Sequence, residues 1–116
     1  ILVRLRAVAD CPPGFEGARG ATGAEAYRLY GRGSGPVLAR LGGRIVWRAR
    51  PEFGLIAPAA ERWDIAFVAE YPSAEVFATM LKDPDYRAAM AHRQAAVADS
   101  RLIRMEGLEA GGDFGG

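Results

Sequence analysis

The sequence predicts an α+β domain in which helices cover one face of a four-stranded antiparallel sheet. Four stretches alternate apolar and polar residues, as half-buried strands do, and helical patterns separate the first stretch from the second and the third from the fourth. The chain has 116 residues, of which 50% are apolar and 25% charged, so it is long enough for one core. We expect a single domain over residues 1–108 and a flexible, glycine-rich tail over 109–116.

The first strand and the first helix are predicted from the N-terminal part of the chain. Residues 1–9 alternate with a period of two, which is typical of a strand. Thr22 and Glu25 have the spacing of a capping box, in which each side chain accepts a hydrogen bond from the other residue's backbone, so a helix begins here. Helix-breaking residues interrupt the pattern, and we expect a kink or break at them: Gly31, Gly33, Gly35 and Pro36.

Three further stretches have the alternation of strands. They cover residues 43–50, 62–71 and 100–107, and the middle one is the clearest. In each of them alternate residues sort into two sets, so each is expected to have one face on the core and one face away from it. These stretches complete a four-stranded sheet.

Two more helices are predicted between the third and fourth strands. Ser73 is a suitable N-cap for a short helix. Asp83 followed by Pro84 starts a longer helix, which we expect to run to about Ala98. Taking this helical region as one unit, the order strand, helix, strand, strand, helix, strand is that of the ferredoxin-like βαββαβ arrangement.

Sorting the strand residues by face separates an apolar set from a mixed set. The apolar face, which the helices must cover, comprises Val3, Leu5, Ile45, Trp47, Ile65, Phe67, Ile103 and Met105. The other face comprises Arg4, Arg6, Arg44, Arg48, Arg50, Asp64, Glu70, Arg104 and Glu106, interleaved with Val46, Ala66, Val68 and Leu102. This face is either solvated or buried in a dimer, and its apolar residues favour a homodimer in which two sheets meet.

Composition argues against several classes of partner and location. Fifteen basic and fourteen acidic residues give a net charge of +1, so we expect no nucleic-acid partner. The single cysteine, Cys11, cannot form an intrachain disulfide, which fits a reducing, cytoplasmic location. No apolar run approaches the roughly 20 residues of a membrane span, so no membrane association is expected. The apolar start is interrupted by Arg4 and Arg6 and predicts a strand rather than a signal peptide.

Metal and cofactor sites find little support in the sequence. One histidine and one cysteine, far apart, do not make a zinc site. One axial histidine is enough to hold haem, so His92 leaves that possibility open, but we expect no metal and no cofactor. Residues 31–35 are glycine-rich but follow a helical pattern and lack the lysine of a phosphate-binding loop.

The helix that follows Pro84 carries the most unusual polar residues. On a helical projection, Tyr86, Met90 and Val97 form a packing stripe with Arg93 in its middle and His92 at its edge. A buried guanidinium without a partner is costly, so Arg93 requires a protein carboxylate, carbonyl groups or an anionic ligand.

Packing is the alternative reading of both polar residues. Glu70 and Asp99 are candidate carboxylate partners for Arg93, whose side chain could also extend to the rim of the core. His92 is readily explained by packing or by exposure at the helix edge, although its ordinary pKa of about 6.5 would also suit proton transfer.

Five aromatic residues are expected where the helices meet the sheet, and they form either core or the wall of a pocket: Tyr27, Tyr30, Tyr86, Trp47 and Trp63. With Arg93 they define a candidate pocket for a small acidic or aromatic molecule.

Several stretches together resemble a known family. They are YRLYG at 27–31, PVLARLGGR at 36–44, ERWD at 61–64, YPS at 71–73, DPDYR at 83–87, HR at 92–93 and ADSRLI at 98–103. In order and spacing they resemble the bacterial domain-of-unknown-function family thirteen-thirty, over roughly residues 20–104. The resemblance implies a ferredoxin-like protomer and a homodimer of the dimeric α/β-barrel superfamily, and it implies no established reaction. Members of that superfamily include monooxygenases without cofactors, isomerases, haem-degrading enzymes and ligand-sensing domains.

Three functions remain open from the sequence. The first is a homodimeric α/β-barrel protein that binds a small molecule between sheet and helices. The second is a cofactor-independent monooxygenase or isomerase with His92 as base and Arg93 as anion clamp. The third is an assembly module without a ligand. A closed interior with Arg93 paired to protein favours the third, and an open cavity containing both residues favours the first two.

Overall fold

The computed structural model describes residues 1–115, with three helices and one four-stranded sheet, which confirms the mixed α+β class. Along the chain the elements are β1 (Leu2–Leu5), α1 (Gly23–Arg40), β2 (Arg44–Ala49), β3 (Ile65–Glu70), α2 (Ala74–Lys82), α3 (Pro84–Ala96) and β4 (Val97–Arg101).

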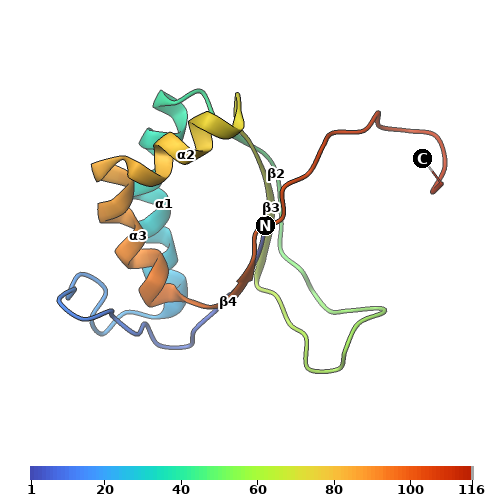
Figure 1. Ribbon diagram of the computed structural model, residues 1–116. Coiled ribbons are helices and arrows are strands. Elements are labelled where there is room, and N and C mark those ends of the chain that lie inside the picture. Colours follow the sequence, from blue (N-terminus) through green and yellow to red (C-terminus); the bar gives the residue numbers. More distant parts are fainter. Residues whose placement is uncertain (116) are drawn as a thin grey trace.

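The sheet has the strand order β2-β3-β1-β4, and every pair of neighbouring strands is antiparallel. All three helices lie on one side of the sheet, whereas residues 50–64 and 102–115 extend away from the helices (Figure 1). The sheet therefore has one face toward the helices, here called the inner face, and one outer face that no helix of the described chain covers.

Local signals place the starts of all three helices. Thr22 and Glu25 form both hydrogen bonds of the predicted capping box at the start of α1. Ser73 caps α2 through the backbone N–H of Val76. Asp83 caps α3, with Pro84 as its first residue. Because each cap depends on residues a few positions apart, the sequence alone was enough to locate it.

The predicted break in α1 is wrong, because the helix is continuous from Gly23 to Arg40 with Pro36 inside it. Close packing between α1 and α3 explains why the helix persists despite its poor helix formers. A Cβ atom on Gly33 would lie 2.9 Å from the Cβ of Ala89, so the missing side chain lets the two helices approach. Tertiary contact here outweighs local propensity.

The last strand lies earlier than expected. The prediction of a helix to about Ala98 and a strand over 100–107 is wrong, because α3 ends at Ala96 and β4 begins at Val97. Val97 takes an extended conformation and pairs with Leu5. The edge strand β4 therefore begins its pairing with β1 directly after α3. Residues 102–107 alternate in sequence but form no strand, and Ile103 and Met105 are exposed rather than on the inner face.

A β-bulge in β2 exchanges the faces predicted for Trp47 and Arg48. Ile45 pairs with Ala69, but Trp47 rather than Val46 pairs with Val68, so one residue is extra. Trp47 therefore lies on the outer face with 55% of its surface exposed. Because the bulge also shifts the next residue, Arg48 pairs with Phe67 and lies on the inner face.

Three more charged residues were assigned to the wrong face. Arg6, Arg50 and Asp64 line the space between sheet and helices instead of the outer face. Each lies just beyond the end of a strand, where the alternation of faces no longer applies.

The buried core is divided between two clusters. One joins Ala18, Ala26, Ala95 and Ala96, and the other joins Val37, Met80 and Tyr86. Among the strand residues Val3 is completely buried, whereas Ile65 and Phe67 at the centre of the inner face are only partly buried. The expectation that the helices cover the inner face is therefore met only in part, and the remaining space is a cavity.

Candidate ligand-binding site

A large cavity lies between the inner face of the sheet and the helices. Its volume is about 1350 Å³, and its apolar wall includes Leu5, Ile45, Ile65, Phe67 and Met90. Small-molecule pockets usually have volumes of about 300–1,000 Å³ and such apolar walls with few polar groups. This cavity is partly open to solvent and is large enough for a small-molecule ligand.

Three of the predicted tyrosines meet on the helix side of the cavity. Tyr27 and Tyr30 of α1 have ring centroids 5.3 Å apart, and Tyr30 and Tyr86 have ring centroids 6.1 Å apart. The hydroxyl groups of Tyr30 and Tyr86 share a hydrogen bond of 2.9 Å. Tyr27, Tyr30 and Tyr86 all line the cavity, so the structure brings this part of the predicted site together.

Burial raises the pKa of the phenols of Tyr27 and Tyr30. Burial raises the pKa of Tyr30 well above its ordinary value, and the hydrogen bond with Tyr86 raises it further. Burial also raises the pKa of Tyr27, although the positive charges of Arg93 and Arg48 oppose the shift. The hydroxyl groups are therefore neutral hydrogen-bonding groups at neutral pH, available to a ligand's oxygen atoms.

Arg93 extends from α3 toward the sheet and lines the cavity. Its Nη2 donates a hydrogen bond of 3.2 Å to Oγ of Ser100 on β4. Both carboxylates considered as partners from the sequence, Glu70 and Asp99, pair with other arginines. Among residues 1–115 no carboxylate forms an ion pair with Arg93, so its charge is not compensated by the described part of the chain.

The cavity concentrates positive charge. Seven arginines line it: Arg6, Arg28, Arg32, Arg48, Arg50, Arg62 and Arg93. None of these seven forms an ion pair with a carboxylate within the described chain. The arginines that do form such pairs lie outside the cavity lining: Arg4, Arg19, Arg40, Arg44 and Arg101.

Asp64 is the single acidic residue among the described residues that line the cavity. Its Oδ2 accepts a hydrogen bond of 2.7 Å from the backbone N–H of Leu5, which fixes the start of β3 to β1. A chain with a net charge of +1 thus has a strongly positive cavity lining, in which Arg6 and Arg93 are partly buried and the other five arginines are exposed. Walls of one charge sign with low dielectric behind them attract ions of the opposite sign.

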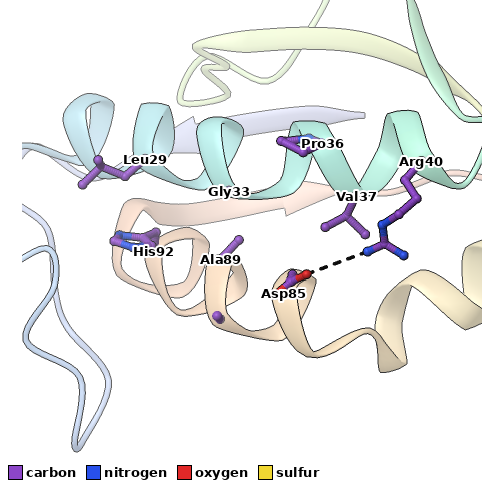
Figure 2. A pocket seen from close by; sticks show the side chains of 9 residues that line it. Leu29, Gly33, Pro36, Val37, Arg40, Asp85, Ala89 and His92 are labelled. Carbon is purple, nitrogen blue, oxygen red and sulfur yellow. Dashed lines mark ion pairs between the residues drawn. The ribbon is translucent and has the colours of Figure 1, made fainter.

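His92 lies away from this cavity. It lines an open groove of about 410 Å³ between α1 and α3, beside Leu29 and Ala89 (Figure 2). Its ring packs edge-on against Phe15, with ring centroids 4.9 Å apart, and its Nδ1 is buried without a hydrogen-bond partner in the described chain. The prediction that His92 and Arg93 border one pocket is wrong, because consecutive helical residues point about 100° apart. His92 instead holds the segment before α1 against α3.

The two predicted tryptophans do not line the cavity. Trp47 lies on the outer face because of the β-bulge. The indole N–H of Trp63 donates to Glu61, and the guanidinium of Arg101 lies 5.3 Å from its ring centroid. Neither tryptophan is available to a ligand held by Arg93.

Sequence reasoning missed most of the cavity's arginines. Arg48 was assigned to the opposite face because a single-residue bulge has no signal in the sequence of one strand. Arg6, whose Nε is buried without a partner in the described chain, could have been recognised from the end of the first strand's alternation. Only Arg93 was recognised, because its position inside a helical packing stripe is a local signal.

Comparison with known proteins identifies the family of the chain. Residues 20–108 match the Domain of unknown function (DUF1330). The chain belongs to this family. The resemblance found in the sequence is thereby confirmed, and no curated protein matches the chain.

Two crystal structures are similar to this member of DUF1330. One is the methylated RPA0582 protein, which is 56% identical, with a TM-score of 0.87, 95% of this chain covered and 78% of the other. The second is RPA0582, a protein of unknown function from Rhodopseudomonas palustris, which is 54% identical, with a TM-score of 0.84, 94% of this chain covered and 79% of the other. The similarity supports the fold and assigns no activity.

The described residues show neither a metal-binding cluster nor a membrane-spanning helix. Residues 1–115 contain no group of three or more His, Cys, Asp or Glu side chains that could hold a metal ion. None of their helices has the length and apolar character required to cross a lipid bilayer.

Proposed function

We propose that this protein binds a small anionic molecule with an apolar or aromatic body in the cavity between sheet and helices. The observation that carries the proposal is the charge of the cavity lining. It contains seven arginines and one carboxylate. Guanidinium groups bind carboxylate or phosphate oxygens with short, charge-assisted hydrogen bonds. The tyrosines and the apolar residues of β3 supply a surface for the rest of the molecule.

Arg93 is the proposed anchor of the anionic group. Its side chain is already held by Ser100, so little conformational freedom is lost when an anion binds. An unpaired arginine in a partly buried place destabilises the free protein, and an anion removes that cost. Because residues 1–115 supply no carboxylate to Arg93, a ligand is the simplest partner for this charge.

A thermal-shift measurement with small aromatic acids tests the proposal. A ligand that binds only the folded state stabilises it by RT ln(1 + [L]/Kd), about 2.7 kcal/mol at a hundredfold excess over Kd. We expect the wild-type Tm to rise by several degrees with aromatic carboxylates. Arg93→Met should abolish the shift while leaving the free protein as stable as the wild type or more so.

Arg87→Met is the matched control for this test. Arg87 lies on the same helix as Arg93 but does not line the cavity. The control variant should keep the full ligand response. A free Arg93→Met protein that is destabilised by several kcal/mol, together with a wild type that responds to no acid, would refute the binding function and favour an assembly module.

An enzymatic function with His92 as base has less support. The imidazole of His92 lies in a separate groove and packs on Phe15, so it is not positioned to accept a proton from a molecule held by Arg93. Binding requires only the groups that the cavity provides.

We also propose that the protomer is ferredoxin-like and forms a homodimer through the outer face of the sheet. The strand order β2-β3-β1-β4 with antiparallel neighbours supports the first part, with α2 as an additional helix. Exposed apolar side chains support the second part, because Val46 and Trp47 lie uncovered beside Val68 in the protomer. Contact between two such faces would bury them.

A further inference from the structure

Two of the arginines that line the cavity approach it from different sides. Arg93 belongs to α3 and reaches Ser100 on β4, at one edge of the sheet. Arg48 belongs to β2, at the opposite edge, and is turned inward by the β-bulge. Strands β3 and β1 lie between these edges, so the two anchoring strands are about 14 Å apart at a spacing of about 4.8 Å per strand.

Tyr27 and Phe67 lie between these arginines. Phe67 is the cross-strand neighbour of Arg48 and faces the cavity. Tyr27 lies near enough to both guanidinium groups for each of them to oppose the rise of its pKa caused by burial. Each end of this part of the cavity thus carries a cation, with aromatic surface in between.

We propose that the ligand carries at least two anionic groups separated by an apolar body, one group held by Arg93 beside Ser100 and the other by Arg48. This inference rests on the proposed function and adds the chemical class of the ligand. Arg48 is exposed and forms no ion pair within the described chain, so its guanidinium is free to bind a second anionic group. A ligand with two separated anionic groups satisfies both and places its body against Tyr27 and Phe67.

Two probes that differ only in the second charge test the inference. The first is 1,4-phenylenediacetate, and the second is 4-methylphenylacetate, in which a methyl group replaces one acid group. Their affinities are measured by calorimetry at the same ionic strength. We expect the diacid to bind about fivefold more tightly than the monoacid, the upper end of what one exposed charged pair contributes.

Variants assign each anionic group to one arginine. Arg48→Met should lower the affinity for the diacid to that for the monoacid and leave the monoacid unaffected. Arg93→Met should weaken both probes. Arg44→Met is the control on the same strand, because Arg44 pairs with Glu70 on the outer face, and it should change neither affinity. Arg48→Gln, checked by its Tm and circular dichroism, replaces Arg48→Met if the latter does not fold.

The outcomes separate this inference from the function on which it rests. Equal affinities of the wild type for the two probes, both lost in Arg93→Met, would overturn the inference and leave the binding function intact. A loss of diacid affinity in Arg44→Met as large as in Arg48→Met would also overturn it, because the effect would then be one of general charge. Absence of binding by either probe at millimolar concentration would overturn both.

Discussion

Gly33 of α1 lies directly against Ala89 of α3, so close that a Cβ atom on Gly33 would be 2.9 Å from the Cβ of Ala89. Gly31, two residues earlier and exposed, has no atom within 4 Å of such a Cβ. The same residue type therefore has two different roles in one helix. Gly33 permits close packing of the helices, whereas Gly31 only weakens the helix.

Alanine substitutions should separate these roles. Gly31→Ala should stabilise the protein by about 1 kcal/mol, because alanine is the better helix former and meets no neighbour. Gly33→Ala should give no such gain, because the added methyl group displaces Ala89. Denaturant unfolding measures both, and the double change of Gly33→Ala with Ala89→Gly should have about wild-type stability, because the gain in α1 is offset by the glycine placed in α3. Equal stabilisation by the two alanines would show that the helices are not in contact at Gly33.

The ionisation of Asp83 should make the free energy of unfolding depend on pH under acidic conditions. The hydrogen bond from Arg40 to its carboxylate, at 2.8 Å, and those from two backbone N–H groups of α3 hold the pKa of Asp83 below its ordinary value. Because the pKa of Asp83 is lower in the folded state, its ionised carboxylate stabilises that state at pH values above the ordinary pKa of about 3.9. This contribution is lost as the pH falls through the lower pKa of the folded state.

Asp83→Asn retains the capping oxygen but loses the charge. We expect its Tm to be below that of the wild type at pH 7 and the difference to shrink as the pH falls below about 4. In an Arg40→Gln background, Asp83→Asn should lower the Tm at pH 7 by less than it does in the wild type. A gap between wild type and Asp83→Asn that is constant from pH 7 to pH 3 would contradict the assignment.

Phe67→Ala should cost less than truncation of a core phenylalanine. Phe67 is partly buried and faces the cavity, so little packing is lost. We expect a loss of about 1–2 kcal/mol, below the roughly 3–5 kcal/mol of a fully packed phenylalanine. Met80→Ala, at a site only 4% exposed, is the comparison and should cost about 2–5 kcal/mol. A larger loss at Phe67 than at Met80 would mean that the cavity is closed in solution.

Trp47→Glu tests the proposed dimer. Trp47 is half-exposed on the outer face, and a carboxylate in the centre of a sheet-to-sheet contact would be buried without a partner. We expect light scattering to give a dimer mass for the wild type and a monomer mass for the variant. Val8→Glu, at an exposed apolar residue outside the sheet, should remain dimeric. A monomeric wild type at micromolar concentration refutes the dimer.

Local signals in the sequence were sufficient for the fold class and the helix starts. Thr22, Ser73 and Asp83 each cap a helix through bonds to residues two or three positions away, so no knowledge of the tertiary structure is required. Arg93 was identified in the same way, from its position in the stripe of one helix. These parts of the fold and site depend on short-range chemistry.

The remaining parts depend on partners that are distant in sequence. The start of β4 at Val97 is decided by its pairing with Leu5, and the continuity of α1 depends on its contact with Ala89. The separation of His92 from Arg93 depends on which side of α3 faces the sheet, and Phe15 occupies the side of His92. No pattern within one element contains this information.

The β-bulge in β2 also determines how relatives of this chain should be compared. Val46 is the extra residue, so a shorter strand without it would still carry the equivalent of Trp47 outward and that of Arg48 inward. An ungapped alignment to such a strand would match Arg48 with a residue on the outer face. The relative would then seem to lack the arginine that lines the cavity. The correct gap belongs at Val46. A one-residue deletion there would leave Arg48 facing the cavity, whereas insertion of one residue between Trp47 and Arg48 without a second bulge would turn the guanidinium out of the cavity.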